Sequence, residues 1–223
     1  MKLSSIIRCL LLASSLASIA ACGGGGSSGG SGGGAGMVLP VLQQPLSALE
    51  GDSLLFIREE EKLARDVYLT LYDRWAEVTF QTIATRSEQT HMDKIKLLLD
   101  AAGLADPVGS NGVGVFNNAA IADLYAQLVA QGSTSLTEAL KVGAFIEEYD
   151  IKDLQEAVVE ATDGTNQLAV IQTYNNLICG SRNHLRSFVS LIELAGIVYT
   201  AQLLPQATVD AIVDSPMEQC GRQ

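Results

Sequence analysis

The chain of 223 residues contains two histidines, His91 and His184, and the first of them follows Glu88 by three positions. On a helix this spacing brings the Glu88 and His91 side chains over the same patch of surface. Carboxylate and imidazole groups together are ligands that proteins use for iron, manganese and zinc. The same Glu-x-x-His spacing also occurs as a salt-linked pair on charged helices. The neighbouring elements must therefore decide whether the pair belongs to a metal site.

The elements that position these groups are expected to be helices. Hydrophobic content is 48% and aromatic content is 5%, and the apolar runs are rich in Ala, Leu, Glu and Gln, which favours helix over strand. No segment alternates convincingly between apolar and polar residues with a period of two. The pattern predicts long helices over about 52–76, 82–102, 135–162 and 167–195, and a shorter one over about 118–131. We therefore predict an all-α fold.

Capping residues support these boundaries. Asp52 or Ser53 is available as the N-cap of the first long helix. The "SLTE" sequence from Ser135 matches a capping box for the third, and Gly103 is placed to end the second.

Each long helix carries an ionisable residue on its own apolar face when successive residues are placed about 100° apart. These residues are Glu60 in the first helix, Glu88 and His91 in the second, Glu147 with Asp150 beside it in the third, and His184 in the fourth. A carboxylate buried without a partner becomes protonated or destabilises the fold by several kcal/mol. A shared divalent cation would remove that cost, so we expect a buried metal site.

Other acidic residues on these helices are expected to point elsewhere. Glu59 and Glu61 fall on the flanks of the first apolar stripe, and Glu148 points away from the third. Loss of Glu61 is therefore expected to weaken metal binding far less than loss of Glu60.

The order of these groups, Glu, Glu-x-x-His, Glu and His, resembles that of the ferritin-like di-iron carboxylate bundles. The long connection over residues 104–134 is also similar to the crossover of such bundles. The stretches "REEEKLARDVYLTLYDRW", "SEQTHMDKIKLLLD", "LKVGAFIEEYDIKDL" and "GSRNHLRSF" are similar to a bacterial ferritin-like family called domain of unknown function 2202. The resemblance extends from about Leu54 to Leu194 and implies a ferritin-like four-helix bundle with a short extra helix in its long crossover.

The resemblance also implies a cofactor and a chemistry. The cofactor is iron, or manganese or zinc, as one or two ions held by Glu60, Glu88, His91, Glu147 and His184. The implied chemistry is that of an oxidoreductase acting with dioxygen or peroxide, of the ferroxidase or peroxidase type. Whether the protein is an enzyme stays open. The alternative is a non-catalytic cell-envelope binding or scaffolding module that uses the polar cluster as a structural network.

One position departs from the di-iron pattern. The last long helix has Ser181-x-x-His184 where Glu-x-x-His is expected, so one carboxylate is missing. Asp150, one turn after Glu147, is another source of an oxygen ligand, although a structural hydrogen bond explains it equally well. A di-metal site with altered ligands, a single-metal site and a site without metal all remain compatible with the sequence.

The first residues resemble a targeting segment. Positive charge precedes an apolar run that ends in "IAAC", which resembles the lipobox of bacterial lipoproteins. We expect a signal peptide over 1–21, a lipid on Cys22 and a flexible Gly/Ser-rich linker over 22–36. The bundle domain is expected over 37–195, followed by a C-terminal tail over 196–223. This arrangement would place the protein at the cell envelope, on the periplasmic or outer-membrane face. The alternative is an ordinary secretory signal with a chance cysteine.

Two of the four cysteines remain after these assignments. Cys9 lies in the expected signal peptide and Cys22 carries the lipid. Cys179 and Cys220 are left in a compartment that permits disulfides. We expect them to pair and to pin the tail to the last long helix.

The acidic balance of the chain limits its expected partners. The formal net charge is −11, whereas nucleic-acid binding needs a basic face. We therefore expect no nucleic-acid partner. The expected partners are a membrane, reached through the lipid anchor, and a small oxidant, and the sequence does not indicate the oligomeric state.

Overall fold

The computed structural model describes residues 40–165 and 167–221. The expected signal peptide, the lipid site at Cys22 and the Gly/Ser-rich linker lie outside these residues. Within the described ranges every regular element is a helix and no strand occurs, so the all-α prediction is confirmed. The elements are α2 (Ala48–Trp75), α3 (Val78–Thr82), the π-helix η1 (Ile83–Glu88), α4 (Gln89–Ala102), α5 (Ala119–Gly132), α6 (Leu136–Asp163), α7 (Leu168–Leu194) and α8 (Gln206–Val213).

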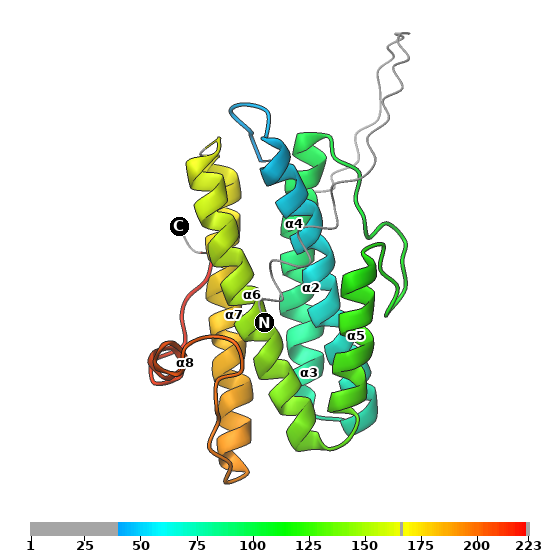
Figure 1. Ribbon diagram of the computed structural model, residues 1–223, viewed down its shortest axis with the longest axis vertical. Coiled ribbons are helices and arrows are strands. Elements are labelled where there is room, and N and C mark those ends of the chain that lie inside the picture. The colour runs from blue at the N-terminus through cyan, green and yellow to red at the C-terminus, as the bar shows by residue number, and fades with distance from the viewer. Residues whose placement is uncertain (1–39, 166, 222–223) are drawn as a thin grey trace, which may run out of the picture. The chain divides into compact units, whose positions relative to one another are not determined.

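The long helices α2, α4, α6 and α7 lie side by side (Figure 1). α6 packs along α7, α2 packs against α4 and η1, and contacts of α2 with α6 and of α4 with α7 close the arrangement. α5 packs on α2 and α6 and belongs to the long connection between α4 and α6. The long helices therefore share one interior. None of the described helices is both long and apolar enough to cross a membrane.

Capping residues explain where the long helices begin and end. Ser47 and Glu50 form a capping box at the start of α2, in which the Glu50 N–H donates to Ser47 Oγ at 3.2 Å and the Ser47 N–H donates to Glu50 at 2.8 Å. The predicted N-cap at Asp52 or Ser53 is therefore wrong. Ser135 caps α6 as predicted, accepting the N–H of residue 138 at 3.1 Å. Gly103 ends α4 with a φ of 68°, which glycine adopts at little cost.

A π-helical segment interrupts the helix that was predicted over 82–102. In η1 the helical turn is wider, and the N–H of Gln89 bonds to the carbonyl of Ala84, five residues earlier. Segments of this kind hold an extra residue in one turn and often occur at functional sites. Here the segment ends on Glu88, directly before the turn of α4 that carries His91.

An aromatic cluster fills one part of the mostly aliphatic core. The rings of Tyr68, Phe80 and Phe188 lie with their centroids 5.2–5.9 Å apart. Gly143 on α6 makes room for this cluster, because a Cβ at that position would lie 2.6 Å from the Phe188 ring. The cluster packs α7 against α6 and α2, so the helices that carry the acidic residues are held in fixed register.

Buried charged groups hold the long connection against α2. Glu59 accepts the backbone N–H groups of Asn117 and Asn118 at 2.5 and 3.0 Å, at the entry to α5. Lys62 is fully buried and forms an ion pair with Asp66. Glu59 was predicted on the flank of its apolar stripe, and the long connection covers that side of α2, because its N–H groups need acceptors.

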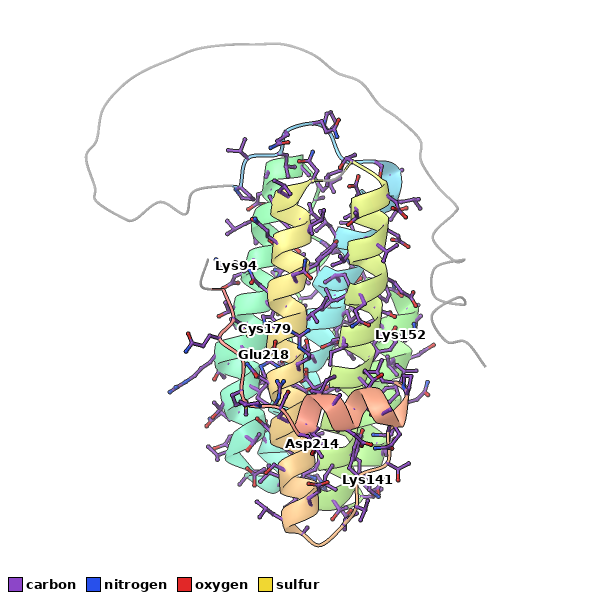
Figure 2. All side chains as sticks on the ribbon, turned by 90° about the vertical axis from the view of Figure 1, so that its left-hand side faces the viewer. Lys94, Lys141, Lys152, Cys179, Asp214 and Glu218 are labelled. Atoms are coloured by element: carbon purple, nitrogen blue, oxygen red, sulfur yellow. A yellow bond between two sulfur atoms is a disulfide. The ribbon has the colours of Figure 1, made fainter. Side chains whose placement is uncertain are left out.

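The tail predicted over 196–223 contains a helix, α8, that the sequence pattern did not indicate. α8 packs on α7 (Figure 2). Glu148 on α6 was expected to point away from the core, but it is buried and accepts the Tyr199 hydroxyl at 2.7 Å and the N–H groups of residues 202–204 at 2.6–3.1 Å. A disulfide joins Cys179 on α7 to Cys220. The tail is therefore tied to the bundle at several points, which include Glu148 and the disulfide.

Candidate metal centre

Five buried residues gather in the interior between the long helices. They are Glu61 of α2, Glu88 at the end of η1, His91 of α4, Glu147 of α6 and His184 of α7. They form two groups of potential ligands, and within each group the ligand atoms lie within 4.8 Å of one another. The first triad is Glu61, Glu88 and His91, and the second triad is Glu88, Glu147 and His184. Glu88 belongs to both.

In the first triad, one ring nitrogen faces two carboxylates. His91 Nδ1 lies 3.1 Å from Glu61 Oε2 and 3.0 Å from Glu88 Oε2. The other edge of the ring faces α7, where a Cβ on Gly180 would lie 2.5 Å from His91 Nε2. Gly180 therefore allows the ring to lie close to the α7 backbone, with Nδ1 directed into the interior.

The second triad repeats this arrangement. His184 Nδ1 lies 2.9 Å from Glu88 Oε1 and 3.3 Å from Glu147 Oε2. His184 Nε2 shares a hydrogen bond with the Ser87 hydroxyl at 2.6 Å, and the Tyr68 hydroxyl donates to Glu147 Oε1 at 2.6 Å. These bonds fix the ring and the carboxylate, so that Nδ1 of both histidines faces the same residue, Glu88.

The spacing of these atoms suits a metal ion as well as hydrogen bonds. Each Nδ1 carries at most one proton, which must serve two carboxylate oxygens in its triad. Neighbouring ligands on an octahedral ion lie about 3.0 Å apart when the bonds are about 2.1 Å long. The nitrogen–oxygen distances of 2.9–3.3 Å are close to that separation. The mixed nitrogen and oxygen donors suit iron, manganese or zinc.

Further carboxyl groups line the same interior. Glu60 and Asp150 are 2% and 1% exposed. Both oxygens of Asp150 lack a hydrogen-bond donor among the described residues. The interior therefore holds two imidazoles and five buried carboxyl groups, counting Glu60 and Asp150 with the three of the triads. If these carboxyl groups were all ionised they would outnumber the imidazoles, and a divalent cation would balance that negative charge.

Comparison with known proteins identifies the family. Residues 50–216 match the family described as "Uncharacterized protein domain (DUF2202)". The chain belongs to the DUF2202 family. It is 46% identical over 177 residues to the uncharacterized protein MJ0754 of Methanocaldococcus jannaschii, and the match covers 79% of this chain and 93% of that protein. The crystal structure of the hypothetical protein MJ0754 is similar, with a TM-score of 0.75 and 44% identity over 80% of this chain and 99% of the other. The resemblance to DUF2202 seen in the sequence is thus confirmed.

In this DUF2202 protein, burial and charge act together on the acidic groups. Burial raises the pKa of Glu61 to about 7, although His91 opposes the shift. Burial also raises the pKa of Glu147. For Glu88 the effect of burial is outweighed by the charges of His184 and His91, which lower its pKa. The shared carboxylate is therefore the one that stays ionised most firmly.

The imidazoles respond to the same carboxylates. Burial would lower the pKa of His184, but Glu147 and Glu88 raise it to about 10. The pKa of His91 is raised well above its usual value in the same way, by Glu61 and Glu88 acting against burial. Both rings of the metal-free protein are therefore protonated at neutral pH. Because a metal ion needs a deprotonated ring nitrogen, an ion that bound these rings would release their protons.

The structure brings together four residues that were predicted as ligands, namely Glu88, His91, Glu147 and His184. Glu60 and Asp150 are buried in the same interior but lie outside both triads. Glu61, and not the predicted Glu60, supplies the α2 carboxylate beside His91. The prediction that Glu61 lies on a flank is wrong, since its exposed fraction is 1%.

The apolar stripes could not predict the positions of Glu61 and Ser181 in the site. α2 contacts α4, α5 and α6, so most directions from its axis lead into the core and the stripe alone does not define its interior face. The available signal was the run of three acidic residues over 59–61, all of which are buried. Ser181 is also buried and donates to the Leu177 carbonyl on its own helix at 3.1 Å, so it takes no part in either triad.

Proposed function

We propose that this protein is a ferritin-like metal-binding protein that holds two ions, of iron or else of manganese or zinc, and uses them in oxidoreductase chemistry with dioxygen or peroxide. The observation that carries the proposal is the position of Glu88. Its Oε1 faces His184 Nδ1 at 2.9 Å and its Oε2 faces His91 Nδ1 at 3.0 Å. A carboxylate that gives one oxygen to each of two ligand groups is suited to bridge two ions.

The other residues have matching roles in this proposal. Glu61 and His91 would hold one ion, and Glu147 and His184 would hold the other. Position 181 holds a serine, where the di-iron pattern would place a carboxylate. Asp150 and Glu60 are buried in the same interior and can supply further oxygen ligands.

The bound ions would supply the redox chemistry and open coordination positions for the oxidant. The side chains of the protein position and shield them. The Tyr68 hydroxyl holds Glu147 Oε1, which leaves Oε2 facing His184. Ser87 is hydrogen-bonded to Nε2 of His184 and so fixes the ring. Nδ1 of His184 would lose its proton when an ion binds there. The ligands are at most 7% exposed, so bulk water has little access to the oxidant.

The connectivity supports the ferritin-like part of the proposal. α4 and α6 are joined by a long connection that contains α5. Ferritin-like bundles have one long crossover and place acidic and Glu-x-x-His ligands on inward faces of their helices. The long helices on both sides of this connection contribute to the two triads.

The cellular location is proposed from the sequence alone. The "IAAC" sequence supports a lipid on Cys22, and the Gly/Ser-rich stretch that follows supports a tether. The protein would then be held at the cell envelope, with the membrane as its partner through the anchor. Labelled fatty acid should enter the unchanged protein and not a Cys22→Ser variant, and equal labelling would contradict the anchor.

The test of metal binding is an anaerobic titration of chelator-treated protein with ferrous iron, followed by measurement of bound iron per chain. We expect about two ions in the unchanged protein, about one in Glu61→Gln and almost none in Glu88→Gln. Glu59→Gln is the matched control, because Glu59 is a buried carboxylate of the same helix that binds the loop before α5. A protein that retains no iron would overturn the proposal.

The test of chemistry follows on the loaded protein. Dioxygen or hydrogen peroxide is added, and the rate of its consumption is compared with that of the same concentration of free ferrous iron. We expect faster consumption by the loaded protein and loss of this difference in Glu88→Gln. Iron that is bound but reacts no faster than free iron would leave a metal-binding protein without the oxidoreductase activity.

The second candidate is a non-catalytic cell-envelope module whose polar cluster is structural. It is favoured by the ion pairs that the cluster forms without a metal, in which His91 faces Glu61 and His184 faces Glu88. The two candidates differ in their response to metal, because an ion that binds only the folded state raises the unfolding midpoint. An unchanged midpoint in excess ferrous iron would favour the structural role.

A further inference from the structure

A cleft opens on the outside of the bundle between α4 and α7. Its volume is about 560 Å³, which lies within the range of small-molecule pockets. Residues 86–94 form one wall, α7 from Ala169 to His184 forms the other, and the tail around Cys220 forms part of the rim. Figure 2 shows Lys94 and Glu218 on this side of the molecule, close to the end of the tail.

Two basic side chains of this cleft are unpaired. Arg86 and Lys94 line the cleft and are exposed. Within the described ranges neither makes an ion pair or a hydrogen bond, whereas the other basic side chains there do. The formal net charge of the chain is −11, so unpaired cations are unusual in it. Both of these line the same cavity.

The acidic residue at the rim does not cancel this charge. Glu218 forms ion pairs with Arg182 and Arg186. Hydrogen bonds from Arg182 above all, and then from Arg186, hold the pKa of Glu218 at about 2. Because its charge is already shared between two guanidinium groups, Arg86 and Lys94 leave the cleft with a positive balance.

The α7 wall offers neutral polar groups. Gln172 and Asn176 line the cleft one turn apart, and their side-chain amides have no hydrogen-bond partner in the described part of the chain. Each amide can donate and accept hydrogen bonds. Thr90 lies on the opposite wall, at the helical spacing midway between Arg86 and Lys94. The walls therefore pair a cationic side with an amide side.

The floor of the cleft meets the outer edges of the two site histidines. His91 and His184 line it, and His184 Nε2 bonds to Ser87, which also lines it. The Nδ1 atoms face the carboxylates on the inner side of the rings. A molecule in the cleft would therefore lie behind the rings and would not compete for the positions beside Nδ1.

We propose that this cleft binds a small organic anion. Arg86 and Lys94 hold its carboxylate or phosphate group through charge-assisted hydrogen bonds, and Gln172 and Asn176 bind its polar body. The volume exceeds what an inorganic ion needs, and the walls are rich in polar groups, so a hydroxylated anion fits the cleft better than an apolar one. This binding does not depend on metal in the triads.

The test uses the purified protein without added metal and three probes that share a polyol body. Glucose 6-phosphate carries a phosphate, gluconate carries a carboxylate and glucose is neutral. Binding is measured by calorimetry and by changes in the histidine ring resonances. We expect saturable binding of glucose 6-phosphate or gluconate, and the stronger of the two identifies the preferred group. We expect at least tenfold weaker binding of glucose.

The matched variants locate the binding. The Arg86→Gln, Lys94→Gln double variant should bind the preferred anion at least tenfold more weakly, and its exposed positions should leave the fold intact. Lys96→Gln is the control, because Lys96 lies on the same helix but is paired with Asp100 outside the cleft. Failure of both anions to bind, or equal binding by the double variant and the unchanged protein, would overturn the proposal whatever the metal content of the triads.

Discussion

Gly180 on α7 lies so close to His91 on α4 that a Cβ at position 180 would be 2.5 Å from Nε2 and 2.7 Å from Cε1 of the ring. No real side chain is accommodated at such a distance without movement of the ring. Because position 180 has no side chain, the His91 ring can lie against α7 with Nδ1 facing Glu61 and Glu88. The position of one candidate ligand therefore depends on the backbone of a neighbouring helix.

A methyl group at this position should disturb the first triad. We expect Gly180→Ala to lower the affinity for the first ion by about 10- to 100-fold, because the His91 ring must shift away from its carboxylates. Competition titration with a chelator measures the affinity, and circular dichroism checks the helix content. Gly112→Ala is the control, since nothing lies within 4 Å of a Cβ there. Equal affinities of the two variants would contradict this role of Gly180.

The neighbouring glutamates of α2 should differ in their effect on metal binding. We expect Glu61→Gln to weaken ferrous binding by about tenfold or more and to do so more strongly than Glu60→Gln, because Glu61 lies 3.1 Å from His91 Nδ1 and Glu60 is in neither triad. This order is the reverse of the one that the apolar stripe predicts. Dissociation constants for both variants, measured side by side, decide it. A greater loss from Glu60→Gln would favour the stripe.

The metal-free protein should lose stability as the pH rises from about 5 to about 9. The pKa of Glu61 is raised from 4.5 to about 7. The folded protein therefore binds this proton more tightly than the unfolded chain, and the stability that this gives is lost as the pH rises from 4.5 through about 7. The pKa of His184 is raised from 6.5 to about 10, so its contribution is complete below 6.5 and is lost toward 10. Urea unfolding should show a slope on the order of 1 kcal/mol per pH unit.

Metal should reverse this trend, because its binding releases protons and therefore strengthens as the pH rises. The loaded protein serves as the comparison in the same urea series. A metal-free protein whose free energy of unfolding is constant or rises over this range would show that the imidazole–carboxylate pairs are not formed.

Loss of the disulfide should destabilise the protein without dissolving the bundle. Cys179 and Cys220 are 41 positions apart, and a bond that closes a loop of this length contributes about 2–4 kcal/mol. We expect Cys220→Ser to lower the free energy of unfolding by this amount, while Glu148 still holds residues 202–204. Urea midpoints with and without a reducing agent test it. The unchanged protein should respond to the reductant and Cys220→Ser should not.

The long helices could be predicted because their signals are local. Ser135 and Gly103 mark helix ends by their own hydrogen-bonding and conformational preferences. α8 was missed because eight residues form a marginal helix alone, and this one depends on packing against α7. The π-helix η1 has no distinctive residues in the sequence, so its place follows from tertiary contacts that a sequence does not display.

The site was partly predictable for a related reason. Glu88, His91, Glu147 and His184 were found because an ionisable group on an apolar stripe is conspicuous. The same rule could not predict which of Glu60 and Glu61 lies beside His91. Successive residues differ by about 100°, which separates inside from outside only where one side of a helix is open. α2 has helices or the long connection on most of its sides, so Glu59, Glu60 and Glu61 are all buried.

The π-helix also limits how the length of this chain can vary. Removing one residue from 83–88 would restore a regular α-helix and rotate everything before it by about 100° relative to Glu88 and His91. Phe80 would then leave its contacts with Tyr68 and Phe188. We therefore expect homologous chains to exclude single-residue deletions from this segment, while its exposed position Thr85 tolerates substitution.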